Sequence, residues 1–156
     1  MNEGMVFIEH EAAAIAESHP EFANSPYVDG LSATLVRRVF ERAGLDADNV
    51  GTDRWNPLSA LIQPGDTVVI KPNLVLDVHQ GGLGLECLIS HVSVIEAILS
   101  WAAKASPGKV IVGDAPLQAC NFENLLHQSN YDRLVKYAEP LGIDFMISDF
   151  RRTVTT

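Results

Sequence analysis

The sequence of 156 residues, with 47% hydrophobic and 20% charged residues, has the length and composition of one globular domain. The 20 acidic and 11 basic side chains give a formal net charge of −9, which argues against binding to nucleic acid or to an anionic membrane surface. The 2 cysteines, Cys87 and Cys120, lie far apart and outside any CxxC pair, which excludes a disulfide framework and a cysteine-ligated cluster.

Four short runs of apolar and β-branched residues predict strands, in chain order at 5–9, 67–71, 109–113 and 144–148. Between them, apolar residues at helical spacing predict helices over 31–43, 92–105, 122–128 and 131–139. Gly44 ends the first helix, Pro107 and Gly108 end the second, and Asn121 caps the third. The segment 45–66 predicts one helical turn and then a tight turn at Pro64-Gly65.

Strands that are apolar at consecutive positions are normally covered on both faces, and their alternation with helices predicts parallel pairing with right-handed crossovers. The expected fold is a single α/β domain over 1–156, a mostly parallel sheet of about four strands flanked by helices in Rossmann-like layers. The first residues lack a basic segment followed by an apolar run, so no signal peptide is predicted. The apolar stretch 92–103 is too short for a membrane span, and a cytoplasmic location is expected.

Charged or titratable groups follow every predicted strand: His10, Lys71, Asp114 and Asp149. In an open parallel sheet the loops at the carboxyl ends of the strands converge, and ligands bind in the crevice between them. These groups are therefore expected to meet at one edge. The chain also commonly reaches the protein surface at the end of a strand, so a charged residue there often does no more than contact solvent.

Lys71 and Arg151 are the candidate charge clamps for an anion, and Asn73 can donate to a ligand oxygen. The structural alternatives are a solvated lysine beside an acid of the next strand, an internal pair between Arg151 and Asp149, and an ordinary turn role for Asn73. Pro72 prevents the following amide from continuing a strand ladder, which marks this position as a strand exit.

Asp114, Asp149 and His91 are the candidate catalytic residues. Either aspartate can act as a general base or metal ligand, or can simply accept amides of its own turn. His91 lies at the start of the 92–105 helix, where it can carry a proton, orient a ligand, or act as a plain cap. Cys87 and Cys120 are expected to be small packed residues rather than nucleophiles.

The stretch 74–90 is a long glycine-containing loop, a type of segment that often forms a lid or binding loop. Its GGLG sequence lacks the GxGxxG spacing of a dinucleotide site, and the chain contains no GxxxxGK[ST], HExxH or GxSxG motif. The sequence therefore assigns no cofactor and no reaction.

The segments PGDTVVIKPNLV, SHVSVIEAILSWAAKA, KVIVGDAPLQACNFENLL and GIDFMISDFRR, in this order over 53–152, resemble the family called domain of unknown function 362. That family has a similar KPN after a strand, a histidine opening the next helix, and GD followed by a small residue and proline. Some members are similar to the nickel-pincer lactate racemase, whose site lies between two α/β domains. Others carry a ferredoxin-like module with four-cysteine motifs, which this chain lacks.

The resemblance implies that the chain is either a short version or the N-terminal lobe of a longer two-lobed protein, and it implies a link to surface-polysaccharide metabolism. The leading hypothesis is a domain that binds a small anionic or phosphorylated ligand through the strand-exit groups at the carboxyl edge of its sheet, and the candidate catalytic residues leave an enzymatic role open. The alternative is a non-catalytic lobe that docks on a second domain, a partner or another copy in a homo-oligomer. The third hypothesis is a metal site made of His79, His91 and Asp114.

Overall fold

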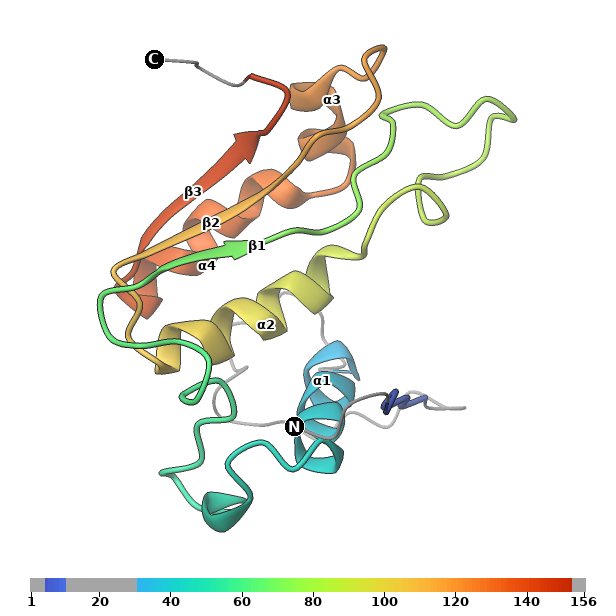
Figure 1. Cartoon of the computed structure of the whole chain (residues 1–156). Helices are drawn as coiled ribbons and strands as arrows, with labels where there is room; N and C mark the ends of the chain where they lie inside the picture. Colours follow the sequence, from blue (N-terminus) through green and yellow to red (C-terminus); the bar gives the residue numbers. More distant parts are fainter. Residues whose placement is uncertain (1–4, 11–30, 153–156) are drawn as a thin grey trace.

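The computed structural model describes residues 5–10 and 31–152 of the chain. Residues 1–4 and 11–18, which entered the signal-peptide prediction, lie outside this part. Three strands form one sheet, in the order β1 (Thr67–Ile70), β2 (Lys109–Asp114) and β3 (Asp144–Asp149), and both pairings are parallel (Figure 1). The prediction of an α/β domain with parallel strands is confirmed.

In the described part of the chain, four α-helices accompany the sheet: α1 (Leu31–Arg42), α2 (Val92–Lys104), α3 (Phe122–Gln128) and α4 (Leu134–Ala138). Short 3-10 helices lie at Ala47–Asn49, Tyr131–Arg133 and Glu139–Leu141, so the helix predicted over 131–139 consists of three short pieces. The helices end where the sequence predicts. Gly44 and Gly142 adopt positive φ after helical turns, and the Asn121 side chain accepts a hydrogen bond from the Asn124 amide at the start of α3.

The strand predicted over 5–9 is wrong, and the sheet formed by the described residues has three strands rather than about four. Residues 5–10 lie beside α1, where Arg42 pairs with the Glu9 carboxylate and donates to the Ile8 carbonyl. Val6 and Ile8 are 82% and 69% exposed. High β-propensity describes how well a side chain fits a pleated surface, and a strand forms only where a neighbouring strand supplies the hydrogen bonds. His10 accordingly does not follow a strand.

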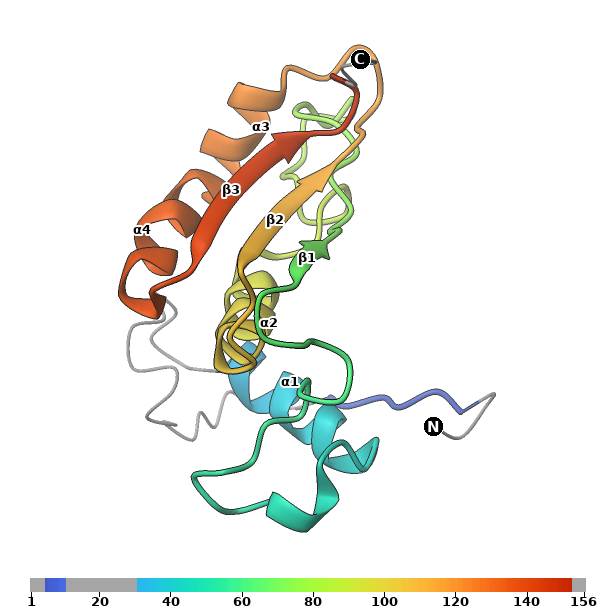
Figure 2. The same cartoon turned by 60° about the vertical axis from the view of Figure 1, so that its left-hand side comes forward.

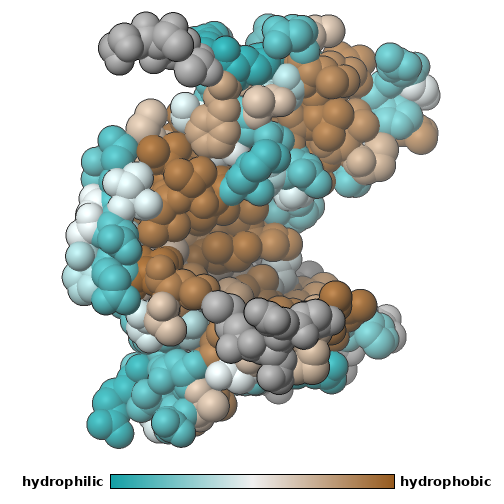
Figure 3. Space-filling model, in the orientation of Figure 1, coloured by the Kyte–Doolittle hydropathy of each residue, from teal (hydrophilic) through white to brown (hydrophobic). Residues whose placement is uncertain are grey.

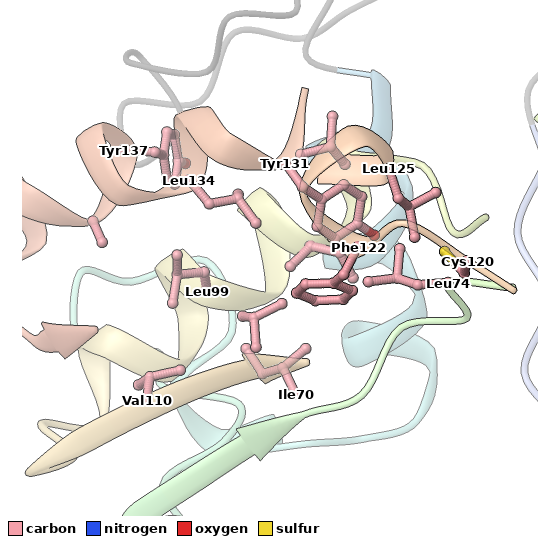
Figure 4. Packing of buried hydrophobic residues seen from close by; sticks show 14 residues of the cluster. Ile70, Leu74, Leu99, Val110, Cys120, Phe122, Leu125, Tyr131, Leu134 and Tyr137 are labelled. Atoms are coloured by element: carbon pink, nitrogen blue, oxygen red, sulfur yellow. The ribbon is translucent and has the colours of Figure 1, made fainter. Parts of the chain in front are cut away.

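The main core lies between the sheet and helices α2 to α4. Figure 4 shows side chains from strands, helices and the segment after β1 meeting in this space. Leu74, Leu99, Val110, Leu125, Tyr131 and Leu134 are fully buried there. A second cluster joins α1 to α2 through Trp55 and Trp101, whose ring centroids are 4.8 Å apart.

The helices cover only one face of the sheet (Figure 2). Right-handed crossovers between strands that follow one another in chain order all pass over the same face. On that face Val110 and Val112 are buried, whereas on the opposite face Val69 is 56% exposed and Met146 is 38% exposed. In the orientation of Figure 1, hydrophobic residues form a broad area in the middle of the molecule, over the strands and α2 (Figure 3). The expectation that both faces would be covered is therefore not met among the described residues.

Gly113 is the position in β2 where any side chain would be excluded. An ideal Cβ atom there would lie 2.2 Å from the Ser148 carbonyl oxygen and 2.8 Å from the Phe150 ring. We expect Gly113→Ala to lower the free energy of unfolding by about 2 kcal/mol, because backbone and ring must both shift. Thermal unfolding followed by circular dichroism measures this loss. Gly81→Ala, whose Cβ would meet only the His79 ring at 3.1 Å, is the control; equal stability of the two variants would contradict the prediction.

Candidate functional site

Lys71 and Asp114 form the first ion pair at the carboxyl edge of the sheet. The Lys71 Nζ atom lies 2.8 Å from Asp114 Oδ1. Asp114 also accepts hydrogen bonds of 2.8 Å from the amides of Leu74 and Ala115. Burial opposes ionisation of Asp114, but these hydrogen bonds outweigh it and lower the pKa of the carboxyl below its usual value. Asp114 is thus ionised and engaged by three donors, which is a poor state for a general base.

Asp149 and Arg151 form the second ion pair, at the exit of β3. Arg151 donates from Nε to Oδ1 at 2.9 Å and from Nη2 to Oδ2 at 2.6 Å, a bidentate arrangement. Its Nη1 donates to the carbonyls of Leu117 and Cys120 at 2.8 and 3.0 Å. The hydrogen bonds from Arg151 lower the pKa of Asp149. The arginine therefore holds the loop after β2, and its planar group is already engaged.

The two ion pairs lie side by side because Asp114 and Asp149 are paired in register at the ends of β2 and β3. The Phe150 amide donates to the Asp114 carbonyl at 2.8 Å, and the Leu117 amide donates to the Val75 carbonyl at 3.1 Å. These contacts tie together the segments that leave all three strands. We call this set of ion pairs and hydrogen bonds the edge frame. The sequence prediction that Lys71, Asp114 and Asp149 meet at one edge agrees with this geometry.

Asp77 extends the edge frame toward α3, a role that sequence reasoning missed. It is 6% exposed and accepts from the Asn121 amide at 3.1 Å and from Asn124 Nδ2 at 2.9 Å. The hydrogen bond from Asn124 lowers the pKa of Asp77. No motif marks this residue, because it lies inside the long loop, six positions after the strand-exit lysine. Its only sequence signal is an acidic residue within an otherwise apolar run, 74–78.

The loop 74–90 closes back on its own base. Leu74 and Ile89 form an isolated antiparallel bridge, the Ser90 amide donates to the Asn73 carbonyl at 2.8 Å, and the Asn73 amide donates to Ser90 Oγ at 3.0 Å. Asn73 thus fixes the loop through its main chain, while the residue itself is exposed. This geometry favours the turn role for Asn73 over direct ligand contact.

A pocket of about 610 Å³ lies between this loop, the start of α2 and the end of α3. Its polar lining residues are Asp77, His79, Glu86, His91, Gln128, Ser129 and Asn130. This volume is in the range of small-molecule sites. Of the six residues predicted for the site, only His91 lines it. The pocket therefore adjoins the edge frame without containing its ion pairs.

Both histidines of the pocket are held in position by hydrogen bonds. His79 Nδ1 is 3.0 Å from the Gly81 amide and accepts its hydrogen bond, so the proton of the neutral ring is assigned to Nε2. His91 Nδ1 lies 2.8 Å from Ser93 Oγ, which lies 2.5 Å from Ser32 Oγ on α1. His91 is the cap residue of α2, as predicted, and makes no side-chain cap hydrogen bond to the helix.

A smaller pocket of about 400 Å³ is lined by Cys120, Asn121, Arg151 and Arg152, among others. Arg152 is the more exposed of its two arginines, with 78% of its side chain accessible against 15% for Arg151. Cys120 is buried, and burial raises the pKa of its thiol. The thiol is therefore poorly suited to nucleophilic chemistry, as the sequence predicted for a packed cysteine.

Within residues 5–10 and 31–152, no group of three or more histidine, cysteine or acidic side chains is arranged to hold a metal ion. The three residues of the predicted metal site do not lie together. His79 and His91 line the larger pocket, whereas Asp114 belongs to the edge frame. The described helices include none that is both long and apolar enough to cross a bilayer.

No family model matches this chain, and neither a curated protein nor a solved structure matches it significantly. The resemblance to domain of unknown function 362 therefore stays a prediction, and so do the lactate racemase relation and the link to surface polysaccharides.

Proposed function

We propose that this domain binds a small anionic ligand in the pocket between the 74–90 loop and the start of α2. The observation that carries the proposal is the pocket itself, about 610 Å³ at the carboxyl end of β1, with two positioned histidines in its lining. Ligands of open parallel sheets bind at this edge. The edge frame has the separate role of holding the loop that forms the pocket wall.

The anionic character of the ligand is supported by the donors that the pocket offers. The Nε2–H group assigned to His79 is a donor, and Gln128 and Asn130 each carry an amide NH₂ group. His91 brings the first turn of α2, with its partial positive charge, to the pocket wall. Asp77 and Glu86 are the lining carboxylates, and both oppose an anion, although Asn121 and Asn124 donate hydrogen bonds to Asp77.

Lys71, Asp114, Asp149 and Arg151 act as positioning residues in this proposal, rather than as clamps and catalysts. Their charges are neutralised in pairs, and the donors of Arg151 are directed at Asp149 and at two loop carbonyls. No reaction is proposed, because hydrogen bonds engage both aspartates and lower the pKa of each carboxyl, which makes them weak bases.

The test is isothermal titration calorimetry with inorganic phosphate at low ionic strength. We expect His91→Ala and His79→Ala each to weaken phosphate binding about tenfold, the effect of one hydrogen bond to a charged group. Glu86→Gln should strengthen binding several-fold, because it removes a like charge from the pocket. His127→Ala is the matched control, since the His127 side chain is 83% exposed and lies outside the pocket lining.

Absence of phosphate binding by the unaltered protein would reject an anion site in this pocket. An equal loss of affinity in His127→Ala and His91→Ala would show that phosphate binds by general charge alone. A weaker affinity of Glu86→Gln would contradict the assigned charge of the ligand.

The second candidate function is a docking lobe, which is supported by the pairing of the strand-exit charges and by the exposed apolar face of the sheet. The two functions use different surfaces, because the pocket lies between the loop and the helices.

A further inference from the structure

The pocket between the 74–90 loop and α2 has an apolar part that an inorganic anion would leave unused. Four apolar side chains belong to its lining, and all of them come from the loop: Val78, Leu83, Leu85 and Ile89. Leu85 and Ile89 are partly buried and pack against the main core. Val78 and Leu83 are 56% and 72% exposed. The apolar lining therefore extends from the core to two side chains in contact with water.

The exposure of Val78 and Leu83 differs from the ordinary scatter of single apolar residues over a protein surface. Among the described residues, Val6 is the only large hydrophobic residue that is more exposed than Leu83. Both side chains belong to the lining of one concave site of about 610 Å³. A ligand with an apolar part would remove them from water, and the free energy gained is proportional to the apolar area that it covers.

Polar groups of the same pocket come from a second wall as well as from the loop. Gln128 is the last residue of α3 and Asn130 follows it, so their side-chain amides belong to a different wall from the apolar side chains. The loop itself contributes His79 and two carboxylates, Asp77 and Glu86. A ligand that contacts both walls therefore needs a polar end and an apolar body.

We infer that the ligand of this pocket is an amphipathic organic anion, a carboxylate with an apolar chain. The inference rests on the proposed anion site, because it assigns the charged end of the ligand to the donors of that site. Pockets of this volume hold organic molecules, and phosphate has no apolar surface to cover Val78 and Leu83. Asp77 and Glu86 disfavour a second negative charge, so a singly charged carboxylate fits better than a phosphate group.

The experiment titrates the full chain with acetate, butyrate, hexanoate and octanoate, each below the concentration at which it forms micelles. Two-dimensional NMR of the isotope-labelled protein measures the dissociation constants and shows which amides respond. We expect the affinity to rise about threefold for each added methylene group, close to the gain for complete burial of one such group. Hexanol, which has the same chain without the charge, should bind more weakly than hexanoate.

Substitutions of the exposed apolar residues test where the chain of the ligand lies. Leu83→Ser and Val78→Ser should each reduce the gain in affinity per methylene group. Leu117→Ser is the matched control, since Leu117 is 58% exposed and lies outside the pocket lining. Met146→Gln is the second control, because Met146 lies on the uncovered face of the sheet, another apolar surface that an alkyl chain can contact. Both controls should keep the full gain.

The possible failures give different results. Equal affinities for acetate and octanoate would overturn the inference and leave the anion site in place. A gain per methylene group that falls in Met146→Gln but not in Leu83→Ser would place the chain on the sheet, which also overturns it. Equal affinities for hexanol and hexanoate would instead reject the proposed anion site, and with it the charge assigned to the ligand.

Discussion

Asp114→Ala is expected to lower the free energy of unfolding by about 2–3 kcal/mol. The substitution removes acceptors for the amides of Leu74 and Ala115, and Leu74 is fully buried, so its N–H group is left without its partner. The Lys71 pair contributes little of this loss, because the Lys71 side chain is 58% exposed and solvent screens the interaction. Urea unfolding at neutral pH measures the effect.

The control for Asp114→Ala is Asp132→Ala, which removes a carboxylate that is 53% exposed and paired with His127. Its effect on stability should stay within about 0.5 kcal/mol. Asp114→Asn should fall between the two, since its amide oxygen still accepts one hydrogen bond. Asp114→Ala should also weaken phosphate binding, because it loosens the base of the 74–90 loop. Unchanged stability in Asp114→Ala would show that the edge frame does not hold the loop.

The contribution of Asp114 depends on pH in a direction set by its lowered pKa. A carboxyl whose pKa is lower in the folded state stabilises the protein above its unfolded pKa. This stabilisation is lost as the pH falls through the folded value. The difference between the unaltered protein and Asp114→Asn should therefore shrink toward acidic pH.

Glu96→Gln is expected to raise the free energy of unfolding by about 2 kcal/mol at pH 8 and to have little effect at pH 4. Glu96 is 1% exposed on α2, with Arg133 Nε 3.3 Å from its Oε1 atom. Burial raises the pKa of this carboxyl from 4.5 to about 7, against the opposing influence of Arg133. Ionising Glu96 in the folded protein is therefore unfavourable.

The sign follows from comparing the folded and unfolded states. Below pH 4.5 the carboxyl is protonated in both states and contributes nothing. As the pH rises from there to about 7, the unfolded state ionises while the folded state stays protonated, so stability falls. Glutamine removes this dependence. Unfolding curves between pH 4 and pH 8 test it, with the exposed Glu123→Gln as control. A loss of stability in Glu96→Gln at pH 8 would show that the pair with Arg133 is net stabilising.

Much of the candidate site could be predicted from the sequence because strand exits in a parallel sheet share one edge. Lys71, Asp114 and Asp149 follow three apolar runs, and their meeting needs only the parallel pairing that the alternation with helices predicts. Their role could not be predicted in the same way. Whether an aspartate is free or engaged depends on which amides and cations lie near it: Asp149 is engaged by the nearby Arg151, as one sequence alternative allowed, whereas Asp114 is engaged by Lys71 and Leu74 from a distant segment.

The pocket could be anticipated only in part. The length and glycine content of 74–90 predict a binding loop, and His91 was placed correctly at the start of α2. The contributions of Asp77, Gln128 and Asn130 depend on how that loop packs against the end of α3. No local pattern encodes such packing, because it is a contact between segments about fifty residues apart in the chain.

The sequence by itself determined the helices, three of the strands, their parallel direction and the edge at which the charged groups gather. These features follow from local apolar periodicity, from helix-ending glycines and prolines, and from the handedness of crossovers. Only the tertiary structure decided that residues 5–10 stay outside the sheet, that the strand-exit charges pair with one another, and that one face of the sheet is open. The physical reason is that strand pairing, ion pairing and burial depend largely on contacts between segments far apart in the chain. A local sequence pattern shows that a segment is able to make such contacts, but not which segment it will contact.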